Sequence, residues 1–573
     1  DLYQLIIDYA RHLKSFYYLC LEVVSARTNF KSSLQPKCQL QKTKKQLIMK
    51  ITIAQNSFKK ADLKYNTEKI SSIVRLAIEN KSQLVVFPEL AITGGYIGTL
   101  VKYPSFWKDL DYYLSQITPL SSEISILMGS YFRFGKDPLN TQILMQDGKI
   151  SSHFEKLNIH NTPGSKLANY VKPSKNDKAN IFNIEDIQFQ FAFGDDLNQT
   201  DFSNSNIDIL ITASNTPFYS NFRNEQIDQL SGIAKSKDTH IININPSGAK
   251  VSEVYPGGSI VLNKNGDVCY ELNLFDAEIA HIDTDILFGY PIVPLEYEKT
   301  ELIYRALIKG IHDYFRDSHQ TKAVLGLSGG IDSALVAALA CDALGSENVH
   351  GILMPSMYSS DHSVEDAKKL AENLNMSYDI VPIKTAYDSV LEMVTPIFHN
   401  KSFDLTEENL QARLRGLTLM AYSNKHGNMV LNTSNKSEEA VGYGTLYGDL
   451  CGGLSVIGDL YKKEVYELSN FLNQDGERIP QNTIAKFPSA ELRPNQKDSD
   501  SLPEYDLLDE IAYQYLEEFK SADEIIKEGY TANTVYKIIH LIRMNEYKRF
   551  QCPPCIKISK FALGVDRNVP LIW

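Results

Sequence analysis

Long hydrophobic runs are absent from this sequence. No stretch of 18 apolar residues occurs among its 573 residues, so no transmembrane helix is expected. No apolar segment near the start ends in a small-residue cleavage site, so a cytoplasmic protein without a secretory signal is expected. Basic residues are in deficit, with 58 Lys and Arg against 70 Asp and Glu. The net charge of −12 argues against a nucleic-acid-binding surface.

Cysteine is scarce as well. The seven cysteines are scattered, and only Cys552 and Cys555 form a Cys-x-x-Cys pair. Because no second pair lies nearby, free thiols in a reducing compartment are expected rather than a zinc site.

The composition is that of a soluble globular protein with more than one domain, at 43% hydrophobic and 22% charged residues. Residues 1–48 carry no motif, whereas an alternating strand pattern opens at Met49. We therefore expect Met49 to be the natural start, and residues 1–48 to be an upstream translation or a dispensable extension.

Two different patterns of predicted strands and helices follow Met49. Up to residue 285, short apolar runs such as 84–87, 124–128, 207–211 and 240–244 alternate with helical segments, which predicts the buried strands of an α/β layer. From about residue 290, a helix over 297–315 leads into strand–helix units. This second pattern predicts a doubly wound parallel sheet with its ligand at the carboxyl ends of the strands.

The most informative motif is the run LSGGIDSA at 327–334, which lies between an apolar strand and a helix. The glycines allow backbone N–H groups to approach phosphate, the two serines add hydroxyl donors, and the helix dipole favours an anion. Asp332 would repel phosphate unless a cation lay between them, which implies Mg²⁺. An ordinary glycine-rich turn is the alternative. The run resembles the loop of ATP enzymes that release AMP and pyrophosphate.

Five further motifs follow in order. They are Met-Pro with Ser-Ser (354–360), Glu-Asn-Leu-Gln-Ala-Arg (408–413), Leu-Asn-Thr-Ser-Asn-Lys-Ser-Glu-Glu through Tyr-Gly-Asp (431–449), Phe-Pro-Ser-Ala-Glu-Leu (487–492) and Lys-Arg-Phe-Gln-Cys-Pro-Pro (548–554). Together they resemble NAD⁺ synthetase in its large form, in which a nitrilase-like glutaminase domain comes first. The resemblance implies an α-β-β-α sandwich at 49–285 and a doubly wound ATP-pyrophosphatase domain at 286–573.

The resemblance also implies a reaction, in which ATP activates nicotinic acid adenine dinucleotide (deamido-NAD) and ammonia attacks the adenylate. It implies ATP binding by Gly326, Leu327, Ser328, Gly329, Gly330, Ile331, Asp332, Ser333 and Thr433. Asp332 and Glu438 are the expected Mg²⁺ ligands, although Glu438 by itself could be a solvated surface acid. Asp332, Glu438 and Lys462 are the catalytic candidates, and Asn409, Arg413, Glu438 and Lys548 are the candidates for deamido-NAD. A homo-oligomer, at least a dimer of synthetase domains, is expected.

The glutaminase half departs from its family. Glu89 and Lys156 match the family's base and lysine, but Gly194 stands where the nucleophilic cysteine belongs, so no thioester can form. Residues 163–167 and Phe222 also replace expected family features, and Cys269 in an apolar strand is expected to be inert. The chain is therefore expected to use ammonia rather than glutamine. This half is then a non-catalytic interaction domain or an enzyme with a reassigned nucleophile or substrate.

A tRNA-modifying enzyme with the same ATP loop is the alternative for the whole chain. Such an enzyme would be expected to show a basic face and catalytic cysteines, and neither is evident in the sequence.

Overall fold

The computed structural model describes residues 49–159, 170–174, 180–200, 207–494 and 496–571. The segment 1–48, and residues 163–167 with their family departure, lie outside these described residues.

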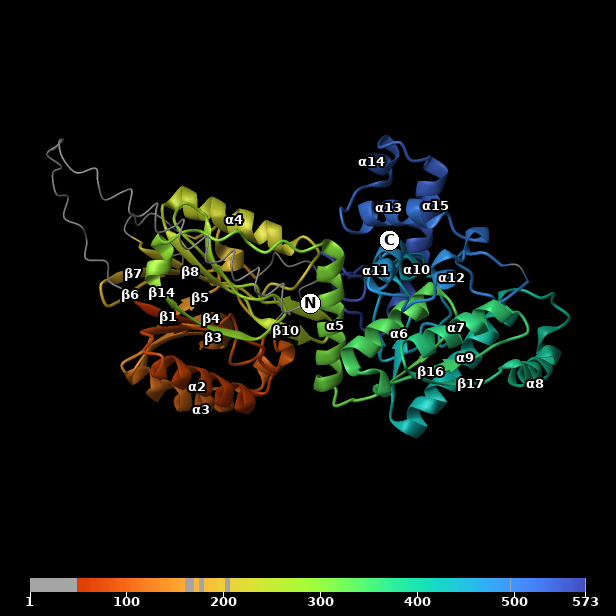
Figure 1. Cartoon of the computed structure of the whole chain (residues 1–573), viewed down its shortest axis with the longest axis horizontal. Coiled ribbons are helices and arrows are strands. Elements are labelled where there is room, and N and C mark those ends of the chain that lie inside the picture. The colour runs from red at the N-terminus through yellow and green to blue at the C-terminus, as the bar shows by residue number, and fades with distance from the viewer. Residues whose placement is uncertain (1–48, 160–169, 175–179, 201–206, 495, 572–573) are drawn as a thin grey trace, which may run out of the picture. The chain divides into compact units, whose positions relative to one another are not determined.

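The first half contains two facing six-stranded sheets. In spatial order, the first consists of β14 (Glu278–Asp283), β1 (Lys50–Gln55), β2 (Leu84–Val86), β3 (Ser125–Phe134), β4 (Asp137–Gln146) and β5 (Lys149–Glu155). The second consists of β13 (Val268–Glu271), β12 (Ile260–Leu262), β9 (His240–Ile244), β8 (Ile209–Ala213), β7 (Ile187–Phe193) and β6 (Ile181–Ile184). Helices α2 (Leu63–Glu79) and α3 (Pro104–Ile117) cover one outer face, and α4 (Phe222–Lys237) covers the other (Figure 1). The expected α-β-β-α sandwich is confirmed.

Strand β7 shows how the sequence builds this sandwich. Phe189, Phe191 and Phe193 alternate along the strand and pack in the core between the two sheets. Ala192, on the opposite face of β7, packs in the cluster under α4. The phenylalanine face of the strand is therefore apolar, whereas the opposite face also carries Gln188 and the buried Gln190. The chain then turns at Gly194.

A β-hairpin of the first half packs against the first helix of the second half. Strands β10 (Ser247–Lys250) and β11 (Glu253–Pro256) pack against α5 (Lys299–Asp317). The backbone N–H of Ala249 donates to Asp313 Oδ2 at 2.8 Å, and Asp313 is fully buried. Arg316 Nη1 lies 2.7 Å from Asp313 Oδ1, so this buried carboxylate is ion-paired as well as hydrogen-bonded.

The second half is built on a parallel five-stranded sheet. Its strands, in spatial order, are β17 (Ser377–Ile380), β16 (Val349–Leu353), β15 (Ala323–Gly326), β18 (Met429–Asn432) and β19 (Leu454–Ser455). The chain runs outward from β15 in one direction and then returns to β18 on its other side. The strand order therefore reverses between β15 and β18, and such a reversal is where doubly wound sheets bind ligands. The predicted doubly wound sheet is confirmed.

Helices surround this sheet. They are α6 (Ile331–Leu344), α7 (Asp361–Asn373), α8 (Lys384–Val394), α9 (Leu405–His426), α10 (Lys436–Val441), α11 (Lys462–Leu472) and α12 (Gln481–Ala485). A further group follows at the C-terminal end: α13 (Tyr505–Leu516), α14 (Ala522–Lys527), α15 (Ala532–Met544) and α16 (Glu546–Arg549). None of the helices in the described ranges is long and apolar enough to cross a membrane.

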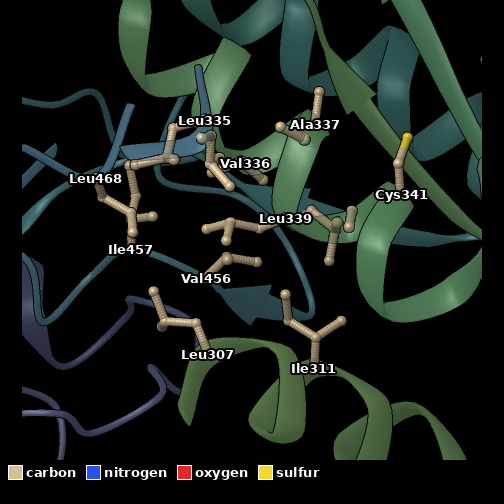
Figure 2. Packing of buried hydrophobic residues seen from close by; sticks show 14 of the residues in the cluster. Leu307, Ile311, Leu335, Val336, Ala337, Leu339, Cys341, Val456, Ile457 and Leu468 are labelled. Carbon is tan, nitrogen blue, oxygen red and sulfur yellow. The ribbon is translucent and has the colours of Figure 1, made fainter. Parts of the chain in front are cut away.

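Helix α6 lies in the centre of this half. Its residues from Ser333 to Cys341 are all buried, because the helix is enclosed by α5, the β15 sheet and α11. Figure 2 shows Leu307 and Ile311 of α5 facing Leu339 of α6, with Val456 and Ile457 beside them. A helix that is apolar on all sides needs such an enclosed position, and this packing fixes the start of α6 next to the carboxyl end of β15.

Candidate functional site

The Ser-Gly-Gly loop connects β15 to α6 at the point where the strand order reverses. Ser328 Oγ and Ser333 Oγ lie 3.0 Å apart, and Ser333 Oγ donates to the Gly330 carbonyl at 3.0 Å. Gly329 has a φ of +78°, and a Cβ at this position would overlap the backbone carbonyl of Ser363. Glycine is therefore required here both by conformation and by the close approach of α7. The loop presents backbone N–H groups at the start of a 14-residue helix, as an anion site requires.

Two carboxylates and one lysine converge beside this loop. Lys462 Nζ lies 2.6 Å from Asp332 Oδ2 and 3.4 Å from Glu438 Oε1. The lysine side chain is 2% exposed, and the two acids are 19% and 17% exposed. Burial favours the neutral amine of Lys462, but Asp332 and Glu438 outweigh it and raise its pKa. Burial raises the pKa of the Glu438 carboxyl, with a smaller contribution from the charge of Asp332. The lysine therefore stays protonated between the two acids.

Asn435 also hydrogen-bonds to both of these acidic residues, and this contact was not predicted from the sequence. Its Nδ2 donates to Asp332 Oδ1 at 2.9 Å, and its Oδ1 accepts from the backbone N–H of Glu438 at 3.0 Å. Asn435 is the N-cap of α10, so the cap that starts this helix also orients both acids. An Asn three residues before Glu438 is a sequence signal that could have identified it.

A pocket of about 800 Å³ surrounds these groups. Nearly all the residues that the sequence analysis singled out in this half line it: Gly326, Leu327, Ser328, Gly330, Ile331, Asp332, Ser333, Asn409, Arg413, Thr433, Glu438, Lys462 and Lys548. Gly329 is not among the lining residues, because it faces Ser363. Lining residues that the sequence analysis did not single out include Arg415, Lys486 and Asp498.

Three of the predicted substrate-binding residues converge on one segment of the pocket wall, residues 442–446. Lys548 Nζ donates to the carbonyls of Gly442 and Gly444 at 2.7 and 2.8 Å. Asn409 Oδ1 accepts from Thr445 Oγ1 at 2.7 Å, and Arg413 Nε donates to the Leu446 carbonyl at 3.2 Å. These contacts bring the three side chains to one segment of the pocket wall and hold that segment in shape.

The Asp332–Glu438 pair has the donor set of a magnesium site. Both ligands are carboxylates, and both already approach a single cationic atom, Lys462 Nζ. Within the part of the chain that the structure describes, no group of three or more acidic, His or Cys side chains converges on a metal position. A metal ion here would therefore need phosphate or water oxygens to complete its coordination, as Mg²⁺ sites at nucleotides usually do.

The first half retains a buried ion cluster at its own candidate site. Lys156 Nζ lies 2.9 Å from Glu89 Oε1 and 2.7 Å from Asp195 Oδ2. Tyr96 OH donates to Glu89 at 2.8 Å, and Asn140 Nδ2 donates to the same oxygen at 2.5 Å. Burial opposes the charge of Lys156, but Glu89, Tyr96 and Asp195 outweigh it and raise its pKa. The structure thus brings together Glu89 and Lys156, which the sequence analysis paired.

Gly194 ends β7 next to this cluster. A Cβ at this position would overlap Ser214 Oγ, so the hydroxyl of Ser214 occupies the space of the missing side chain. Phe222 is buried at the start of α4 in the apolar core, where a charged residue would be unfavourable. Cys269 is 3% exposed, and burial raises the pKa of its thiol. The five described cysteines are all free, and none of them lies in the position of Gly194.

Comparisons with known proteins agree with both halves. Residues 303–552 match a family model described as NAD synthase, and residues 50–287 match one described as carbon-nitrogen hydrolase. The chain is 36% identical over 570 residues to the glutamine-dependent NAD(+) synthetase of Thermotoga maritima, covering 91% of this chain and 98% of that protein. It is also 36% identical over 531 residues to the protein of that name from Synechocystis, covering 88% and 95%.

Solved structures agree with these matches. The glutamine-dependent NAD+ synthetase of Acinetobacter baumannii, determined in complex with adenosine diphosphate, aligns with a TM-score of 0.74 at 32% identity, over 92% of this chain and 98% of that one. A glutamine-dependent NAD(+) synthetase from Cytophaga hutchinsonii aligns with a TM-score of 0.81 at 18% identity, which concerns the fold alone. These findings do not support the tRNA-modifying alternative.

Proposed function

This chain belongs to the glutamine-dependent NAD(+) synthetase family of ATP-dependent carbon–nitrogen ligases, and from that premise we propose that it converts deamido-NAD to NAD⁺ with free ammonia as the nitrogen source. The observation that supports the synthetase reaction most directly is the single pocket that gathers the Ser-Gly-Gly loop, Asp332, Glu438 and Lys462. The observation that supports ammonia is Gly194 beside an otherwise retained Glu89–Lys156 pair.

The proposed reaction has two steps. The carboxylate of deamido-NAD attacks the α-phosphorus of ATP, a new oxygen–phosphorus bond forms, and pyrophosphate leaves. Ammonia then attacks the activated acyl carbon, the carbon–oxygen bond to AMP breaks, and the nitrogen loses a proton to give the amide. The Ser-Gly-Gly loop holds the departing pyrophosphate through its N–H and hydroxyl donors, and Lys462 contributes positive charge where negative charge develops. Mg²⁺ held by Asp332 and Glu438 would neutralise the same charge.

The segment 442–446, with Asn409, Arg413 and Lys548 behind it, is the proposed wall for deamido-NAD. Because these three side chains already hydrogen-bond to this segment, they would act partly by fixing the shape of the wall. Thr433 lines the same pocket directly after strand β18, which fits the proposed role at ATP.

Assays with ammonium or glutamine as the only nitrogen donor test the proposed use of free ammonia. We expect NAD⁺ to form from deamido-NAD, ATP, Mg²⁺ and ammonium, with stoichiometric AMP and pyrophosphate. Glutamine in ammonium-free buffer should support no synthesis, because no thiolate is present at position 194 to form an acyl-enzyme. Release of ADP and phosphate would refute the adenylation step. Glutamine-dependent synthesis would refute the loss of glutaminase activity without affecting the synthetase assignment.

We also propose that the chain forms a homodimer through its α8–α9 face. Large apolar side chains that are more than half exposed gather on this part of the chain: Met393, Ile397, Phe403, Leu405 and Leu417, exposed by 69, 69, 53, 68 and 66%. Exposed large apolar side chains on consecutive elements favour an interface in this region. Light scattering should give twice the chain mass, and I397E with L417E should give the monomer mass; an unchanged mass would refute this face.

A further inference from the structure

Residues 486–492, which include the Phe-Pro-Ser-Ala-Glu-Leu motif, border the pocket and are fixed to the start of α7. All seven of these residues line the pocket, together with Ser359 and Ser363 from the α7 side. The motif is thus part of the site, although none of the residues assigned above to ATP, metal or deamido-NAD lies in it.

Glu491 makes the attachment. Its carboxylate accepts from Ser360 Oγ at 3.1 Å, from Ser363 Oγ at 2.8 Å and from Lys486 Nζ at 2.7 Å. Burial disfavours its charge, but the bonds from Lys486 and Ser363 outweigh burial and lower its pKa. The backbone of Glu491 has a φ of +48°, a conformation that a non-glycine residue keeps only when its surroundings hold it.

This attachment lies directly beside the Ser-Gly-Gly loop. Ser363 is the residue whose backbone carbonyl leaves no room for a Cβ on Gly329. Lys486 Nζ contacts Ser363 Oγ as well as Glu491. Ser363 therefore links the ammonium of Lys486 to the loop that is proposed to hold pyrophosphate.

Lys486 is also better placed than Lys462 to accept a further anion. Lys462 already lies between two carboxylates, whereas Lys486 has one carboxylate partner, and that partner is shared with two serine hydroxyls. An ammonium has three donors, and Glu491 and Ser363 use two of those on Lys486, which leaves one for a ligand. The Lys486 side chain is 29% exposed and lines the pocket, so a ligand there can reach it.

We propose that Lys486 is a further ligand of the ATP polyphosphate, and that Glu491 is a positioning residue that holds Lys486 beside the Ser-Gly-Gly loop. This inference rests on the proposed function, because it takes the loop to be the phosphate site. The attraction between an ammonium and phosphate oxygens is a charge-assisted hydrogen bond, which is among the stronger polar contacts in a protein.

The first test is calorimetric titration of ATP with Mg²⁺ into the full chain and its variants. We expect Lys486→Met to weaken ATP binding at least tenfold and Lys486→Arg to recover part of the loss. In steady-state assays the KM for ATP should change more than kcat does. The matched control is Lys369→Met on helix α7, which removes an exposed ion pair with Glu477. This control should bind ATP as the wild type does.

The second test separates positioning from a general effect on folding. Glu491→Gln keeps an oxygen that accepts from Lys486 and should retain most of the ATP affinity, whereas Glu491→Ala should lose about as much as Lys486→Met. In the Lys486→Met background, Glu491→Ala should have no further effect, because its partner is already gone. Additive losses in the double variant would refute the positioning role.

The outcomes distinguish this inference from the proposed function. If the wild type binds ATP and forms NAD⁺ while Lys486→Met binds ATP equally well, the inference is wrong and the synthetase assignment stands. If the wild type binds no ATP at all, the proposed function falls and this inference falls with it.

Discussion

At the scale of single residues, the two acids beside the Ser-Gly-Gly loop should be essential for turnover and unimportant for folding. Both lie partly exposed at the sheet edge, and neither belongs to an apolar core. We expect Asp332→Asn and Glu438→Gln each to lower kcat by about a hundredfold or more, because each removes stabilisation of charge on the leaving group. The thermal midpoint should change little. Near-normal kcat at saturating Mg²⁺ would show that the altered residue is not a metal ligand.

Restoring one cysteine should not restore the glutaminase. In Gly194→Cys the new Cβ must displace the hydroxyl of Ser214, and Phe222 remains buried where the family resemblance implies a lysine. We expect no glutamate release from glutamine by Gly194→Cys, nor by its combination with Ser214→Ala, which removes the overlap. Iodoacetamide labelling of position 194 provides the control that the thiol is present. Measurable glutamate release by either variant would mean that Gly194 is the only defect.

At the scale of elements, the β10–β11 hairpin contains a lysine in an unfavourable position. Lys250 is 6% exposed, and its ammonium lies 4.4 Å from the centre of the Tyr255 ring. Burial, with a smaller contribution from Lys60, lowers its pKa to about 7. In the unfolded chain a lysine has its ordinary pKa of 10.5, so between pH 7 and pH 10.5 the unfolded chain binds this proton more tightly than the folded chain does. The stability of the folded chain should therefore rise with pH across this window.

Lys250→Met tests this directly. The substitution should raise the free energy of unfolding by about 2 kcal/mol or more at pH 7, since a shift of one pKa unit corresponds to about 1.4 kcal/mol. The gain should shrink as the pH rises towards 10.5, because the wild-type lysine becomes neutral in the unfolded chain as well only above that value. Urea unfolding at pH 7 and pH 9.5 measures it, with the exposed Lys235→Met on α4 as the control. A pH-independent gain would indicate improved packing rather than removal of a buried charge.

The elements were predictable where a strand is apolar and short. The expected strand at 240–244 is β9 to the residue, because apolar residues bounded by polar turns specify a covered strand. The expected strand at 124–128 continues in the structure to Phe134, since its exposed end pairs with β4, which contains Pro138 and polar residues and has no clear pattern. The helix expected at 297–315 begins two residues later, because Glu298 is still extended. The β10–β11 hairpin was not predicted, as it depends on packing against α5.

The sequence predicted which residues make up the candidate site, but it did not predict which of them contact one another. Motif order identified Asp332, Glu438 and Lys462, and the structure brings all three to one pocket. The sequence could not indicate that Lys462 bridges the two acids, because Asp332 and Lys462 are 130 residues apart and meet only through the sheet. The same reason hid the contact between Lys486 and Ser363, which belong to segments 123 residues apart.

At the scale of the whole molecule, a chain shortened to begin at Met49 should fold and keep its synthetase activity. Met49 is 1% exposed, its N–H donates to Thr284 Oγ1 at 3.1 Å, and its carbonyl accepts from the Thr284 N–H at 2.8 Å. Met49 is therefore already hydrogen-bonded to Thr284 as the first residue of the described fold. Soluble yield, circular dichroism and ammonium-dependent NAD⁺ synthesis measure the outcome. Insoluble protein after removal of residues 1–48 would show that the fold needs them.

The lysine between the two acids has a consequence for the protein without its metal. Lys462 supplies a built-in counter-ion, so Asp332 and Glu438 do not face each other as bare like charges when Mg²⁺ is withdrawn. The protein should thus be able to rest metal-free in a folded, inactive form. We expect EDTA to stop turnover of the wild type while shifting its thermal midpoint by less than about 2 °C, and activity should recover fully when Mg²⁺ is added. In Lys462→Met the same chelation should lower the midpoint measurably further, because in that variant only the metal separates the two carboxylates.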